Sequence, residues 1–192
     1  MKKIVLTFGF ISGAIMSALM TAIMVFAHQT NPSNGMILGY TIMVLSFLLV
    51  FFGIRSYREN VGNGYISFGR ALGVGFLIML ISCACYVATW EVVYHKVMPD
   101  FSKKYMAQSI ERVRASGKSP QQIETEIARM KSMMELYNNN IFFNMAITFL
   151  EPLPVGVLMS LVSALILRKR RRDEQDLQDY RDGVKQTSVN PV

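Results

Sequence analysis

The chain has 192 residues, of which 52% are hydrophobic and 17% are charged, and its formal net charge is +7. The hydrophobic share is slightly above, and the charged share well below, that of an average soluble domain. Four nearly uncharged stretches hold close to half of the residues, and each is near or above the roughly 18 to 20 residues that cross a bilayer. We therefore expect an all-α polytopic membrane protein with a four-helix bundle rather than a soluble domain.

The first apolar stretch covers residues 4–27. It is longer than the roughly 7 to 15 residues of a signal-peptide core, so we expect a retained span. Gly9, Gly13 and Ser17 recur every four residues and share one face of a helix. Small residues on one face let a neighbouring helix approach closely, which predicts helix packing there.

The second and third spans are expected at about residues 36–54 and 71–90. Gly69 and Gly73 at the start of the third span, with Ala71 and Gly75 beside them, form a second small-residue stripe that predicts helix packing. Cys83 and Cys85 point to different sides of a helix and are read as small packing residues. Several aromatic residues lie near the expected boundaries, as in an interfacial aromatic belt. They are Tyr57, Tyr65, Tyr86, Trp90 and Tyr94.

The long connection between the third and fourth spans is patterned as an outer helical segment at about residues 100–137. Apolar residues recur at helical spacing up to Ala115, and Gly117 is typical of a helix end. Ser119, Pro120 and Gln122 then mark a helix start, because they supply an N-cap, a first-turn proline and a capping-box partner. We expect a helical hairpin whose Met-rich face packs against the bundle or the bilayer.

The fourth apolar stretch, residues 141–167, contains an ionisable residue, and its span is expected at about 148–167. Glu151 is followed by Pro152 and Pro154, which remove helix hydrogen bonds to the carbonyls of Thr148 and Leu150. Two interpretations stay open: a helix that restarts at the outer rim of the membrane, or a site for a ligand, proton or ion. Further along, Gly156 and Ser160 form a third small-residue face.

The distribution of basic residues sets an expected orientation. The connection after the first span has no Lys or Arg, whereas Arg55, Arg58 and Arg70 bracket the next one, and a basic block follows Leu167. The positive-inside bias then places both termini in the cytoplasm. This orientation also puts the eight basic residues of the connection 91–140 outside, which is the observation that weighs against it. The three arginines are candidate functional residues, and the basic clusters predict contact with the lipid bilayer and its anionic headgroups rather than with nucleic acid. A polar, disordered cytoplasmic tail is expected at residues 173–192.

No motif for catalysis, phosphate binding or metal binding is evident in the sequence. His28 and His95 fall at expected outer span ends and are read as interfacial residues. We therefore expect no catalytic residues, no metal and no cofactor.

Three segments carry a resemblance to a known family. They are residues 53–58 (GIRSYR), 64–75 (GYISFGRALGVG) and 151–156 (EPLPVG). With them the chain, over roughly residues 4–172, resembles the bacterial membrane proteins grouped as domain of unknown function 4199. The resemblance implies a four-span protein of the bacterial inner membrane with an outer helical segment, and it implies no reaction or substrate.

Two functional hypotheses follow. The preferred one is a non-enzymatic integral inner-membrane protein that acts as an accessory or scaffold subunit, with a homo-oligomer or another membrane protein as its partner. The alternative is a small transporter or channel component in which Glu151 handles a proton, a cation or a small polar solute.

Overall fold

The computed structural model describes residues 1–26 and 32–169, and its elements in these ranges are helical. They are α1 (Lys2–Phe26), α2 (Pro32–Asn60), α3 (Phe68–Val92), the π-helical turn η1 (Val93–Val97), α4 (Phe101–Arg114), α5 (Pro120–Asn139), α6 (Ile141–Leu150) and α7 (Leu153–Leu167). Four segments are long and apolar enough to cross a membrane: α1, α2, α3 with η1, and α6 with α7. The prediction of an all-α, four-span protein is confirmed. The predicted tail at residues 173–192 lies outside the described residues.

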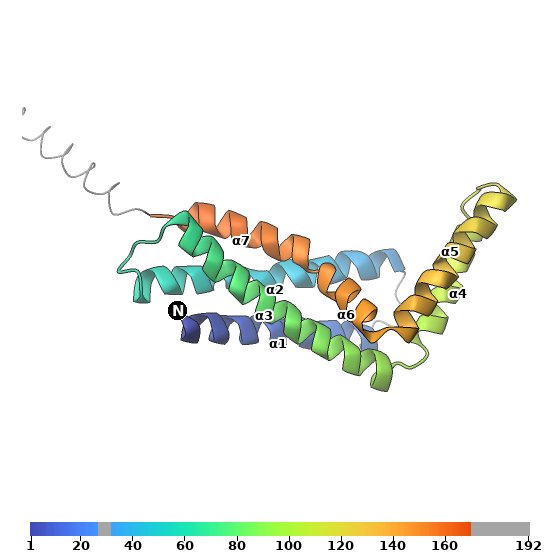
Figure 1. Ribbon diagram of the computed structural model, residues 1–192, viewed down its shortest axis with the longest axis horizontal. Coiled ribbons are helices and arrows are strands. Elements are labelled where there is room, and N and C mark those ends of the chain that lie inside the picture. The colour runs from blue at the N-terminus through green and yellow to red at the C-terminus, as the bar shows by residue number, and fades with distance from the viewer. Residues whose placement is uncertain (27–31, 170–192) are drawn as a thin grey trace, which may run out of the picture.

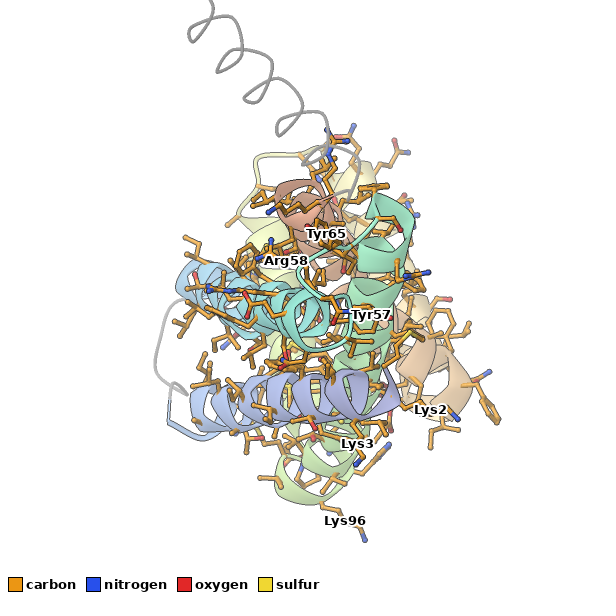
Figure 2. All side chains as sticks on the ribbon, turned by 90° about the vertical axis from the view of Figure 1, so that its left-hand side faces the viewer. Lys2, Lys3, Tyr57, Arg58, Tyr65 and Lys96 are labelled. Atoms are coloured by element: carbon orange, nitrogen blue, oxygen red, sulfur yellow. The ribbon has the colours of Figure 1, made fainter. Side chains whose placement is uncertain are left out.

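Four helices run side by side along the long axis of the molecule, namely α1, α2, α3 and α7, while α4 and α5 project from one end (Figure 1). The central helix is α3, because it contacts α1, α2, α6 and α7. The N-terminus, the α2–α3 loop and the end of α7 lie at the other end (Figure 1). Figure 2 faces that end and shows Lys2, Lys3 and Arg58 there, so we call it the basic end.

Glycines set the closest helix contacts in the bundle. A Cβ atom at Gly13 would lie 2.6 Å from Cβ of Cys85 and 3.2 Å from Cα of Ser82, both on α3. At Gly156 on α7, an added Cβ would lie 2.4 Å from Cγ of Met79. These distances leave no room for a side chain, so α1 and α7 approach α3 only because glycine stands at these positions.

On α3 the structure corrects the choice of packing residues made from the sequence. Nothing lies within 4 Å of a Cβ built at Gly69 or Gly73, and both residues are exposed. Gly75 is the glycine that faces inward, where its added Cβ would lie 3.2 Å from Cβ of Ser160 on α7. Ala71, one turn earlier, is fully buried. The sequence shows two interleaved small-residue rows here, and only the direction from which α2 and α7 approach decides which row packs.

Buried hydroxyl groups also join the helices. Ser12 donates a hydrogen bond of 2.8 Å to the carbonyl of Ser46 on α2, and Ser82 donates one of 3.1 Å to the carbonyl of Gly9 on α1. Ser17 lies on the glycine face of α1 and accepts a 3.0 Å hydrogen bond from Thr89 on α3. Such bonds stabilise helix association by about 0.6 kcal/mol each in membranes.

The segment between α3 and α6 forms the predicted helices. Ser119 accepts a hydrogen bond from the backbone N–H of Gln122, whose side chain accepts one from the N–H of Ser119. Pro120 occupies the first turn, so the predicted start of this helix is confirmed. Gly117, with a φ of +71°, adopts the left-handed backbone that glycine allows after α4. The helices α4 and α5 contact each other, and α5 also contacts α6.

Two helices run beyond the apolar stretches that identified them. The apolar stretch of α2 ends at residue 54, but the helix continues to Asn60, where Arg55 and Glu59 form an ion pair of 2.9 Å one turn apart. The third span extends through Val92 and η1, so Glu91 and His95 lie within the helical segment rather than in a loop. Hydropathy marks where a helix is apolar, whereas the helix itself ends where its backbone hydrogen bonds end.

Candidate functional site

The site lies where the fourth apolar segment bends. α6 ends at Leu150, and α7 begins at Leu153 with Pro152 as its N-cap and Pro154 in its first turn. Glu151 and Pro152 both keep right-handed helical backbone angles, so the chain bends without reversing, and Figure 1 shows α6 turning away from the line of α7. The helix therefore restarts just after Glu151, with Pro154 inside the first turn of α7, and both interpretations of Glu151 stay open.

At this bend the hydroxyl of Tyr86 donates a hydrogen bond of 3.1 Å to Oε2 of Glu151. Tyr86 belongs to α3 and is buried, whereas Glu151 is exposed on the protein surface. The expectation of an interfacial belt was therefore wrong for Tyr86, which points into the fold and holds the carboxylate. The hydrogen bond joins the bend of the fourth segment to α3.

Tyr86 and Glu151 form part of the wall of two cavities. The smaller has a volume of about 120 Å³ and is lined mainly by residues of α1 and α2, such as Met16, Met20 and Tyr40. The larger has a volume of about 560 Å³ and lies among α3, α4, α5 and α6. Met24, Tyr86 and Glu151 line both cavities, so Glu151 lies where the two cavities adjoin.

A chain of side-chain hydrogen bonds runs along the wall of the larger cavity. Nε1 of Trp90 donates to the hydroxyl of Tyr137 over 2.8 Å, and that hydroxyl lies 3.1 Å from Oγ1 of Thr148. Thr148 in turn donates to Oδ1 of the buried Asn144, so Tyr137 must donate to Thr148. Burial raises the pKa of the Tyr137 hydroxyl above its ordinary value, which keeps it protonated as this donor. The chain ties α5 to both α3 and α6.

Aromatic rings surround these hydrogen bonds. Trp90 and Phe101 pack edge to face with centroids 5.4 Å apart, and Tyr94 and Tyr137 do so at 5.5 Å. The hydroxyl of Tyr94 also bonds Asn138. Like Tyr86, Trp90 and Tyr94 are buried rather than placed in an interfacial belt. Their spacing of four residues, which puts 86, 90 and 94 on one face of the helical segment formed by α3 and η1, was the signal that could have shown this.

Sequence reasoning missed Glu91. Its side chain is only 15% exposed, and Nε2 of His95, one turn later, lies 3.2 Å from its Oε2. Both oxygens of the carboxylate are buried, and among the described residues neither accepts a hydrogen bond. The i, i+4 spacing of Glu91 and His95 was visible in the sequence, but the expected end of the span at residue 90 assigned both to a loop.

The candidate arginines lie elsewhere. Arg58 donates a long hydrogen bond of 3.5 Å to the carbonyl of Leu167 at the far end of α7, and Arg55 pairs with Glu59. Arg70 is exposed at the start of α3. The 15 residues of α7 separate Glu151 from Leu167, which corresponds to about 22 Å. The structure therefore does not bring the arginines and Glu151 together.

At the basic end, backbone hydrogen bonds join two loops. The N–H of Ile66 donates to the carbonyl of Lys169 over 2.9 Å, and the N–H of Lys169 returns a bond of 3.0 Å. Nζ of Lys169 lies 5.7 Å from the ring centroid of Tyr65, which Figure 2 places at this end. The end of α7 is thereby held against the α2–α3 loop.

Among the described residues, no group of three or more His, Cys, Asp or Glu side chains is placed to hold a metal ion. Cys83 is buried and Cys85 partly buried in α3, and both are free thiols.

Comparison with known proteins identifies the family. The family model described as "Protein of unknown function (DUF4199)" matches residues 7–169, which is most of the chain. The chain belongs to this family. No curated protein and no solved structure matches it.

Proposed function

Starting from this family of unknown function, we propose that the chain is a small, non-enzymatic transporter or channel component that binds a cation at Glu151. The observation that carries the proposal is the hydrogen bond from Tyr86 to a carboxylate that lines two cavities in a membrane-spanning segment. Ionisable groups within spans are costly, and they mark solute or proton pathways more often than packing.

The bend itself supports cation binding. Pro152 and Pro154 have no N–H to offer the carbonyls of Thr148 and Leu150, so these oxygens lack their ordinary helix donors. Broken membrane helices present backbone carbonyl oxygens without helix donors to cations, and Glu151 adds a carboxylate in the same bend. This proposal is narrower than the hypothesis drawn from the sequence, because it names a cation and leaves out the small polar solute that the sequence also allowed.

The test uses the full chain reconstituted in proteoliposomes. We expect uptake of at least one of three cations: protons, followed with an internal pH dye, ⁸⁶Rb⁺, or radiolabelled tetraphenylphosphonium. Glu151→Gln should reduce that uptake at least tenfold because the carboxylate charge is lost, while Glu124→Gln, an exposed position on α5, should not change it. No uptake of any of the three cations, or equal uptake by both variants, would exclude the transporter role.

A second candidate is an accessory or scaffold subunit. The observation in its favour is that α4 and α5 project from the bundle, and that α5 contains no buried residue (Figure 1). A photo-crosslinking residue at Met133, which is 52% exposed, should then capture one specific membrane protein or a second copy of the chain in cells. Absence of a defined crosslinked species would count against this candidate.

A further inference from the structure

The larger cavity is too roomy and too apolar for a bare metal ion. Its volume of about 560 Å³ is within the range of about 300 to 1,000 Å³ found for sites of organic ligands. Its wall is made mostly of aromatic rings and methionine side chains. They include Tyr86, Trp90 and Tyr137 of the aromatic residues, and Met24, Met130 and Met134 of the methionines.

Several polar atoms of this wall are already used within the protein. Nε1 of Trp90 donates to Tyr137, the hydroxyl of Tyr137 bonds Thr148, and the hydroxyl of Tyr94 bonds Asn138. An occupant of the cavity therefore meets ring surfaces and thioethers more than hydrogen-bonding groups. Aromatic rings attract cations, and flexible methionines adapt to ligands of different shapes.

Charge then selects the occupant. Glu151 is the one ionisable carboxylate among the residues that line the cavity, and no Lys, Arg or His is among them. A neutral apolar occupant such as a lipid chain would leave this carboxylate without a counter-charge, and an anion would be repelled by it.

We infer that the cavity binds an amphipathic organic monocation. Its positive centre lies near Glu151 and Tyr86, and its apolar groups fill the space between the methionines of α5 and the aromatic face of α3. This inference rests on the proposed role of Glu151, and it names the class of cation that the protein takes.

The single tryptophan of the chain lies in the cavity wall, which provides a direct readout. The full-length protein in lipid nanodiscs is titrated with tetraphenylphosphonium while the fluorescence of Trp90 is recorded. We expect saturable quenching, an affinity at least tenfold weaker in Glu151→Gln, and an unchanged affinity in the matched control Glu124→Gln.

Tetraphenylborate, which has the same shape and the opposite charge, should produce no saturable quenching. Equal binding of the two ions, or equal binding by wild type and Glu151→Gln, would mean that the cavity is only an apolar space and would overturn the inference. If tetraphenylphosphonium does not bind but uptake of protons or Rb⁺ depends on Glu151, the inference is wrong while the proposed function stands. If none of the three cations is taken up and none binds, both are wrong.

Discussion

At the scale of single residues, the clearest feature is that glycines of similar sequence context have different roles. Gly13 and Gly73 both lie inside apolar helices, and both belong to rows of small residues. Only Gly13 has a neighbouring helix against it, because a Cβ there would lie 2.6 Å from Cys85. A methyl group added at Gly13 must therefore move α1 away from α3, whereas one added at Gly73 meets open space.

This difference predicts opposite effects of the same substitution. Gly13→Ala should lower the stability of the protein in detergent by about 1 to 3 kcal/mol, because overpacking displaces a helix backbone. Gly73→Ala, the matched control, should be neutral or slightly stabilising, since alanine favours the helix more than glycine does. Thermal unfolding of the two purified variants is the measurement, and equal melting temperatures would contradict the packing described for α1 and α3.

The side chains at the site find their hydrogen-bond partners far away along the chain. The place of Glu151 inside an apolar stretch made it a candidate from the sequence, but its hydrogen-bond partner, Tyr86, is 65 residues away along the chain. The same holds for Tyr137, which joins Trp90 across 47 residues. These partners turn an isolated carboxylate into a site with a defined wall.

At the scale of elements, the bend between α6 and α7 positions the site. Pro152 and Pro154, on either side of Leu153, have no backbone N–H, so two helix hydrogen bonds are missing. The helix therefore cannot continue straight through Glu151. α6 can therefore lean toward α3 and α5, where Thr148 reaches Tyr137.

Removing both prolines should straighten this segment. In the double variant Pro152→Ala and Pro154→Ala, the restored N–H groups can bond the carbonyls of Thr148 and Leu150, and a straight helix has the longest end-to-end distance. Spin labels at the exposed positions Phe142 and Ile166 should then move apart toward about 36 Å, the length of 24 residues of straight helix. Pulsed electron resonance measures this distance. Leu153→Ala, between the prolines, should leave it unchanged, and an unchanged distance in the double variant would show that the prolines do not cause the bend.

At the scale of the whole molecule, the two ends differ in character. One end carries Lys2, Lys3 and Arg58 together with the α2–α3 loop, and the other carries the projecting α4 and α5 (Figures 1 and 2). The positive-inside bias predicts that the basic end faces the cytoplasmic side of the membrane, against anionic headgroups. The eight basic residues of the connection 91–140 weigh against this orientation, so the prediction needs a direct test.

Cysteine labelling provides that test. In a background without Cys83 and Cys85, a single cysteine at Lys118, in the α4–α5 loop, should react with an impermeant thiol reagent on intact cells. A cysteine at Asn63, in the α2–α3 loop, should react only after the cells are opened. Labelling of position 63 but not 118 on intact cells would reverse the orientation and place the cavity beside Glu151 toward the cytoplasm.

Three features were determined by the sequence alone because each depends on neighbouring residues. The four spans follow from hydropathy summed over about 20 consecutive residues, the start of α5 from the capping residues at 119–122, and the bend from two prolines without N–H groups. Local chemistry of this kind acts whatever the rest of the chain does.

Only the tertiary structure decided which face of each span packs and which groups meet at the site. Lipid chains are as apolar as leucine side chains, so hydropathy does not distinguish a helix face that contacts lipid from one that contacts another helix. The rotation of α3 about its axis places Gly75, rather than Gly73, against α7 and turns Tyr86 and Trp90 toward Glu151 and Tyr137. That rotation is set by the shapes of four helices packed together, which no single segment of the sequence contains.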